Sequence, residues 1–301
     1  MKYINYTMIM LLTLVTIAIS QTKYTWTGGS GSWQTASNWT PNGIPGAADT
    51  AVINNGTVTN DNSVNVAGLF QNGGTINGVG NLIIADKFNF IAGTQSGTGT
   101  TTIASGATLD FLSSLTKTIS RTIVVDGSLT LIGAGPVSIS SGGQLVNNGT
   151  VDIQNSNSFG SADGSITNNG NFIRSLSTGT ATIGAPFTNN GTITVLTGTL
   201  LINNITGSGS FNISSGAKFR INSGTSTLGG SSITGEGVFE VVGGTLNFTG
   251  NDVVVSNTTT FRQAGGTIGG SGNLVINGFF NFETGTQSGT GTTTIASGAT
   301  L

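Results

Sequence analysis

The chain has 301 residues, with nine Lys and Arg, eleven Asp and Glu, no histidine and no cysteine. The few basic residues are scattered, so we expect no nucleic-acid partner, because phosphate binding needs a basic face. The absence of cysteine excludes disulfides and thiolate metal sites, and the absence of histidine removes the commonest general base and most zinc sites.

Residues 1–20 predict an export signal. Lys2 is the only charge among the first 22 residues, an apolar run extends from Ile9 to Ile19, and small residues at Ala18 and Ser20 form a cleavage pattern before Gln21. A membrane anchor is the alternative, but this run is shorter than the ~20 apolar residues that a span requires. We therefore expect an exported protein, extracellular or on a bacterial cell surface, without a transmembrane span after cleavage.

Residues 21–53 differ in composition from the rest, because all three tryptophans, Trp26, Trp33 and Trp39, lie there. We predict an N-terminal cap, since a repeat array must cover the open end of its apolar core and its exposed strand edge. The alternative is a carbohydrate platform of exposed tryptophan rings.

The same stretch carries a resemblance to a known group. Its pattern Trp-x-Gly-Gly-x-Gly-x-Trp at 26–33, followed by Ser37-Asn38-Trp39 and by Pro45–Ala51, resembles the start of large bacterial secreted β-helix proteins. These include autotransporter passenger domains and related surface adhesins. The resemblance implies a parallel β-helix at the cell surface or outer membrane. Such proteins normally end in an outer-membrane barrel or a sorting module, so we expect that the chain is truncated.

A long internal repeat follows at residues 54–301. The seventeen residues Gly93–Leu109 recur unchanged as Gly285–Leu301, and Leu69–Leu109 matches Phe261–Leu301 at thirty of forty-one positions with an offset of 192. The sequence therefore predicts a second 192-residue copy that is cut inside its first part.

A finer period of 21 residues lies inside the block. Asn-Asn-Gly begins at Asn147, Asn168 and Asn189, and each triplet precedes a short run that alternates apolar and polar residues. Such runs are typical of strands, and Asn-Gly favours tight turns. The period predicts a right-handed parallel β-helix with coils of about 21–24 residues, in which these three asparagines form a ladder. An antiparallel sandwich or barrel is the alternative.

Two polar patterns suggest minor alternatives. Asn60-Asp61-Asn62 weakly resembles a calcium loop, but a solvated turn explains it better. Thr-x-Thr pairs, which on a flat solenoid face could bind ice, start at the unevenly spaced positions Thr57, Thr180, Thr192 and Thr258.

The acids form no tight motif, so we assign no catalytic residue, cofactor or metal ligand. Glu236 and Glu240 come closest, but four residues along a strand separates them too far to share a proton. Carboxylates on neighbouring coils could still reach the ~5–9.5 Å separation that glycoside hydrolysis uses.

The leading hypothesis is a non-enzymatic surface protein, adhesin-like or a structural stalk, with glycans or host-cell components as partners. The alternatives are a polysaccharide-active enzyme or its scaffold, and an ice-binding protein.

Overall fold

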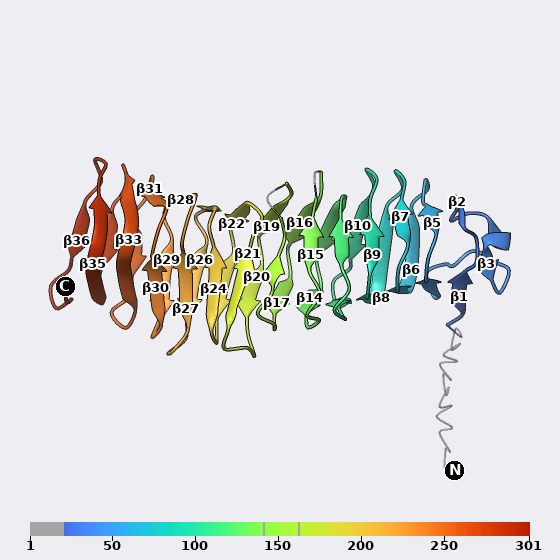
Figure 1. The fold of residues 1–301 in the computed structure, drawn as a ribbon, viewed down its shortest axis with the longest axis horizontal. Helices are drawn as coiled ribbons and strands as arrows, with labels where there is room; N and C mark the ends of the chain where they lie inside the picture. The colour runs from blue at the N-terminus through green and yellow to red at the C-terminus, as the bar shows by residue number, and fades with distance from the viewer. Residues whose placement is uncertain (1–20, 141, 162) are drawn as a thin grey trace, which may run out of the picture.

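The computed structural model describes residues 21–140, 142–161 and 163–301, so the predicted export signal at 1–20 lies outside the described residues. The chain winds as a parallel β-solenoid of about 12 turns, and the coils stack along one long axis (Figure 1). This confirms the predicted all-β parallel β-helix and excludes the antiparallel alternative. The handedness stays a prediction. No helix in the described part is long and apolar enough to cross a bilayer.

Each coil contributes one strand to each of three parallel faces, and four long strands bend through a corner to serve two faces. The first face holds β1 (Lys23–Trp26), β4 (Thr50–Ile53), the second parts of β6 (Val64–Gln71) and β8 (Leu82–Phe90), β11 (Thr108–Phe111), β14 (Ser128–Leu131), β17 (Thr150–Ile153), β20 (Asn171–Arg174), β23 (Thr192–Val195), β26 (Ser210–Ile213), β29 (Ser232–Gly235), β32 (Val253–Val255), β34 (Leu274–Ile276) and β36 (Thr293–Ile295).

The second face is built by strands that follow those of the first. It holds β2 (Ser30–Ser32), β5 (Thr57–Thr59), β7 (Thr75–Asn77), β9 (Gly93–Gln95), β12 (Lys117–Ile119), β15 (Val137–Ile139), β18 (Ser158–Phe159), β21 (Thr180–Ile183), β24 (Thr199–Ile202), β27 (Lys218–Ile221), β30 (Val238–Val241), and the first parts of β33 (Thr260–Gly270) and β35 (Phe279–Gln287).

The third face completes each coil. It holds the first parts of β6 and β8, then β10 (Thr100–Ile103), β13 (Thr122–Val125), β16 (Gln144–Asn147), β19 (Ser165–Asn168), β22 (Phe187–Asn189), β25 (Ile205–Gly207), β28 (Thr225–Leu228), β31 (Thr245–Phe248), and the second parts of β33 and β35.

The alternation of side chains forms the core. In β14, Leu129 and Leu131 are buried while Ser128 and Thr130 are half-buried on the outer surface. Because successive side chains on a strand point to opposite faces, every coil sends its apolar residues to the same axis. The resulting core runs without interruption from Trp26 to Phe280.

The predicted asparagine ladder forms inside the solenoid. Nδ2 of Asn147 donates to Oδ1 of Asn168 at 2.7 Å, and Nδ2 of Asn168 donates to Oδ1 of Asn189 at 2.8 Å. All three side chains are fully buried. Each neutral amide thus uses the next coil as its partner, which a buried polar group requires.

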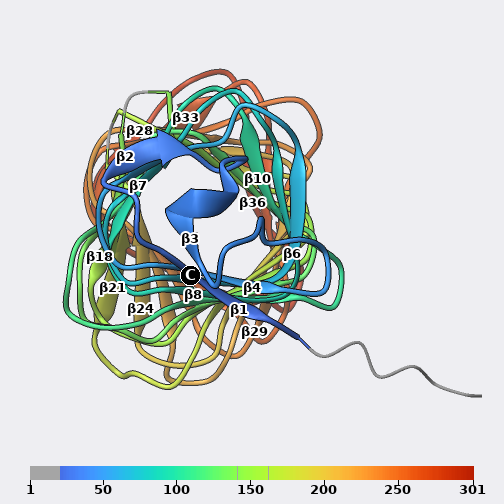
Figure 2. The same ribbon diagram turned by 90° about the vertical axis from the view of Figure 1, so that its right-hand side faces the viewer.

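The N-terminal tryptophans pack together at one end of this core. Trp39 makes edge-on contacts with Trp26 and Trp33, at centroid distances of 5.1 and 4.9 Å, and all three rings are buried. Trp39 begins β3 (Trp39–Thr40), which pairs antiparallel with β1 after the 3₁₀ helix η1 (Ala36–Asn38). Seen along the axis, β3 lies across the ring of coils (Figure 2). The boundaries of the predicted cap stay a prediction.

The 192-residue repeat is out of phase with the coils. Gly93–Gln95 forms β9 on the second face, whereas the identical Gly285–Gln287 ends β35 on the third face. Likewise, Thr101–Ile103 lies on the third face and Thr293–Ile295 on the first. The second copy is therefore advanced by one face, which is a third of a turn.

Candidate functional site

The acids singled out by sequence do not form a carboxylate pair. Glu236 is exposed in the turn before β30, whereas Glu240 is buried and contacts Arg220 and Arg262. In the weak calcium pattern, Asn60 is buried, and its Nδ2 donates to carbonyls of Gly80 and Asn81. Among the described residues, no three of the His, Cys, Asp and Glu types gather where a cation could bind.

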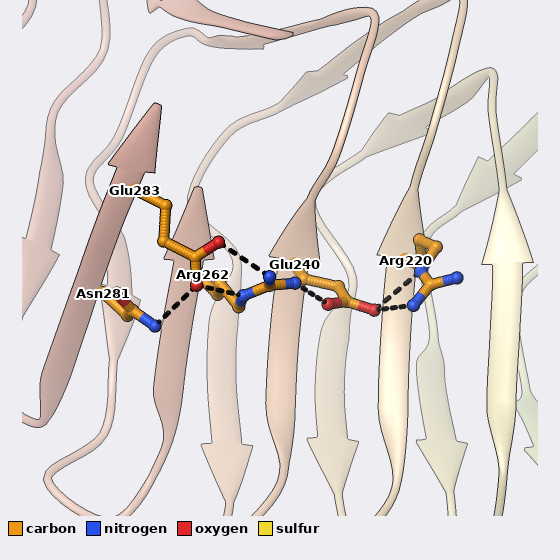
Figure 3. A network of polar contacts seen from close by, with 5 residues as sticks. All are labelled: Arg220, Glu240, Arg262, Asn281 and Glu283. Carbon is orange, nitrogen blue, oxygen red and sulfur yellow. Dashed lines mark hydrogen bonds and ion pairs between the residues drawn. The ribbon is translucent and has the colours of Figure 1, made fainter. Parts of the chain in front are cut away.

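Side chains of alternating charge form a ladder on the outer surface of the second face. The ladder spans four coils, and Figure 3 shows its members in line. Arg220 Nη2 lies 2.6 Å from Glu240 Oε1, Arg262 Nη1 lies 2.8 Å from Glu240 Oε2, and Arg262 Nη2 lies 2.8 Å from Glu283 Oε2. Asn281 Nδ2 also donates to Glu283 at 3.1 Å. We call Arg220, Glu240, Arg262 and Glu283 the charge ladder.

The contact between Arg262 and Glu283 favours the ionised form of both groups. Hydrogen bonds to Glu283 and Glu240 raise the pKa of Arg262, and the hydrogen bond from Arg262 lowers the pKa of Glu283. Catalytic carboxylic acids need a proton near neutral pH, which calls for the opposite shift. Glu283 is therefore suited to joining coils through its ion pair rather than to donating a proton.

Among the residues that the structure describes, three buried cations, Lys117, Arg121 and Arg174, form no ion pair with a carboxylate. Arg174 donates to the carbonyls of Ile153, Ser175, Ser177 and Gly179, and so braces the corner between the first and second faces. Lys117 braces an equivalent corner through the carbonyl of Leu115.

The third buried cation, Arg121, binds the carbonyls of Gly99 and Gly80 at 2.7 and 2.9 Å. Burial lowers the pKa of all three cations, that of Arg121 to about 10. These groups support the fold, because stacked corner carbonyls surround them.

The threonine pairs of the ice-binding alternative do not adjoin one another. They lie on β5, β21 and β23 and at the start of β33, and none of these strands pairs with another of the set. The tryptophan rings, which would have to be exposed to bind sugars by stacking, are 0–3% exposed.

A groove of about 570 Å³ opens on the outer surface where strands of the third face leave for the first. Its walls and floor are neutral, with amides from Asn190 and Asn251, hydroxyls from four Thr and Ser residues, and three glycines. We call it the corner groove. Two further hollows, of about 440 and 420 Å³, lie against the core residue Phe280 and the exposed Phe282 and Leu301 of the last coil.

Sequence reasoning missed the charge ladder and the buried cations. The charge ladder carries a signal in the sequence, because Arg220, Glu240, Arg262 and Glu283 follow one another at intervals of about one coil. Arg174 also had a signal, since it shares the inward register of Phe172.

Comparison with protein-family models, with curated proteins and with solved structures finds no match for this chain. Its function must therefore be argued from its own residues and geometry.

Proposed function

We propose that this chain is the rod-like part of an exported cell-surface protein, adhesin-like or a structural stalk, of the kind to which its first coil shows a resemblance. The observation that supports this most is the unbroken parallel stack of about 12 turns. At about 4.8 Å per coil this makes a rod on the order of 60 Å long. A rod with a continuous core holds its two ends apart, which is what a stalk does.

The surface chemistry agrees with this role. Outward positions of the three faces carry mostly Thr, Ser and Asn. Some of the charges pair with one another, four of them in the charge ladder and Lys87 with Asp110. Such a surface stays hydrated and has little general affinity for polyanions. The predicted export signal at residues 1–20 supports a location outside the cell or on its surface.

The test is a binding screen on purified full-length chain. Fluorescently labelled protein is applied to bacterial and host cells, to extracellular-matrix proteins and to a panel of immobilised glycans, with heat-unfolded protein as the control. Saturable binding that requires the folded chain supports an adhesive role. Absence of binding on every surface contradicts adhesion and leaves the stalk, and release of reducing sugar from any polysaccharide contradicts both.

A further inference from the structure

The corner groove exists because the corner changes shape from coil to coil. The turn from the third to the first face has two residues after β22 and β25, three after β28 and four after β31. The longest of these turns, residues 249–252, forms one wall through Thr249, Gly250 and Asn251. Asn190 forms the opposite wall, three coils away, or about 14 Å.

The floor between the walls contains glycines, which have no side chain to fill the groove. Gly207 has a φ of +122°, and a Cβ there would lie 2.1 Å from the carbonyl oxygen of Asn189. A Cβ on Gly229 would lie 2.2 Å from the carbonyl oxygen of Thr249. Stacking thus requires glycine at both positions, and the backbone is left open to close approach.

The wall at Asn190 ends a second, outer ladder of side chains. Asn148 donates to Asp126, Asn169 to Asn148, and Asn190 to Asn169, with distances of 2.8–2.9 Å. Every Nδ2 points back to the preceding coil, so every Oδ1 faces the following coil. Beyond Asn190 the next coil carries the smaller Ser208, and the described residues offer no donor to Oδ1 of Asn190.

We propose that the corner groove binds a short neutral oligosaccharide, a proposal that rests on the surface role above and names the partner of its adhesive form. The free amide acceptor of Asn190 faces a groove that also presents hydroxyls of Thr206, Ser208, Thr227 and Thr249. Sugar hydroxyls donate and accept, and so match this mixed set. An anionic ligand would need basic groups, and a peptide would need apolar pockets, neither of which lines this groove.

The groove is shallow and carries no aromatic ring, so binding is expected to be weak, with a Kd on the order of 1 mM. Cellohexaose, maltohexaose and mannohexaose are the neutral probes, and a polygalacturonate hexamer is the anionic probe. Binding to the full chain is followed by amide chemical shifts in ¹⁵N–¹H NMR spectra. We expect at least one neutral probe to shift amides of residues 206–208 and 249–251 and the anionic probe to leave them unchanged.

Three variants test the location. Asn190→Ala removes the acceptor and Ser208→Phe fills the groove, and each should weaken binding at least five-fold. Asn148→Ala, which breaks the same outer ladder two coils away, is the matched control and should bind as the parent does. Equal weakening in all three, equal binding of the anionic probe, or no shift in the groove with any neutral probe overturns the proposal.

Failure of the groove can be told apart from failure of the surface role. If the parent chain adheres to cells or glycans and Ser208→Phe adheres equally well, the groove is not the adhesive site and the surface role stands. If the parent adheres to nothing but a neutral probe still shifts the groove amides, the groove stands and adhesion is wrong.

Discussion

The asparagine ladder and the charge ladder join coils in opposite surroundings. Asn147, Asn168 and Asn189 lie inside the solenoid and are neutral, whereas the charge ladder lies on the outer surface of the second face and consists of ion pairs. Both place one side chain per coil and bond it to the next. The two ladders show that the stack can hold a neutral or a charged column of side chains, and the desolvation cost of a buried charge favours neutral amides in the interior.

The largest effect is expected from placing charge in the interior column. Asn168→Asp removes the Nδ2 donor and buries a carboxylate between two amides, so it should lower the free energy of unfolding by about 3–5 kcal/mol at pH 7. Urea denaturation measures this. Burial raises the folded-state pKa of such a carboxyl, so the part of the loss due to ionisation should shrink as the pH falls through that raised value and be gone below the unfolded value of about 4. Asn169→Asp, in the exposed outer ladder, is the control and should change stability by less than about 0.5 kcal/mol.

Arg174 is an exception to the rule that the interior columns are neutral, because its charged side chain is fully buried. Its guanidinium bonds four corner carbonyls. Arg174→Met should cost about 2–3 kcal/mol, because buried acceptors then lose their donor. Thermal unfolding with and without the substitution checks this, and a neutral result would show that these carbonyls find water instead.

A smaller effect is expected at the centre of the charge ladder. Glu240 is fully buried between two partly exposed arginines, so Glu240→Gln should cost about 1–2 kcal/mol. Glu240 keeps one arginine when the other is removed, so removing both arginines together should cost more than the sum of the single changes, because it leaves a buried carboxylate without a partner. Additive losses in a double-mutant cycle would contradict coupling along the ladder.

The smallest effect is expected at the exposed end of the ladder. The hydrogen bond from Arg262 lowers the pKa of Glu283, so its contribution is complete above its unfolded pKa of about 4.3 and is lost as the pH falls through the lower folded value. Parent and Glu283→Gln should therefore differ slightly at neutral pH and converge in acid. The difference should also vanish in 1 M salt, which screens exposed pairs.

The asparagine ladder could be predicted from the sequence, whereas the charge ladder was missed, and the reason is physical. Asn147, Asn168 and Asn189 sit in an identical triplet, so the 21-residue period marks them directly. The charge ladder has four residues of two types at intervals of 20, 22 and 21 residues, so its spacing is a weaker signal than a repeated triplet, and the register of the strands is needed to show that the side chains meet. The corner groove depends on differences in turn length between coils, which no residue pattern marks.

The offset between the 192-residue repeat and the coils affects what additional copies would present. Each copy turns the pattern by one face, so a ligand-binding corner in one copy would point about 120° away in the next. A chain with several copies would display that corner in a screw-like order around the rod, and the same direction would return after three copies. Such an arrangement meets partners from every side, whereas a repeat in phase with the coils would line its sites along a single edge.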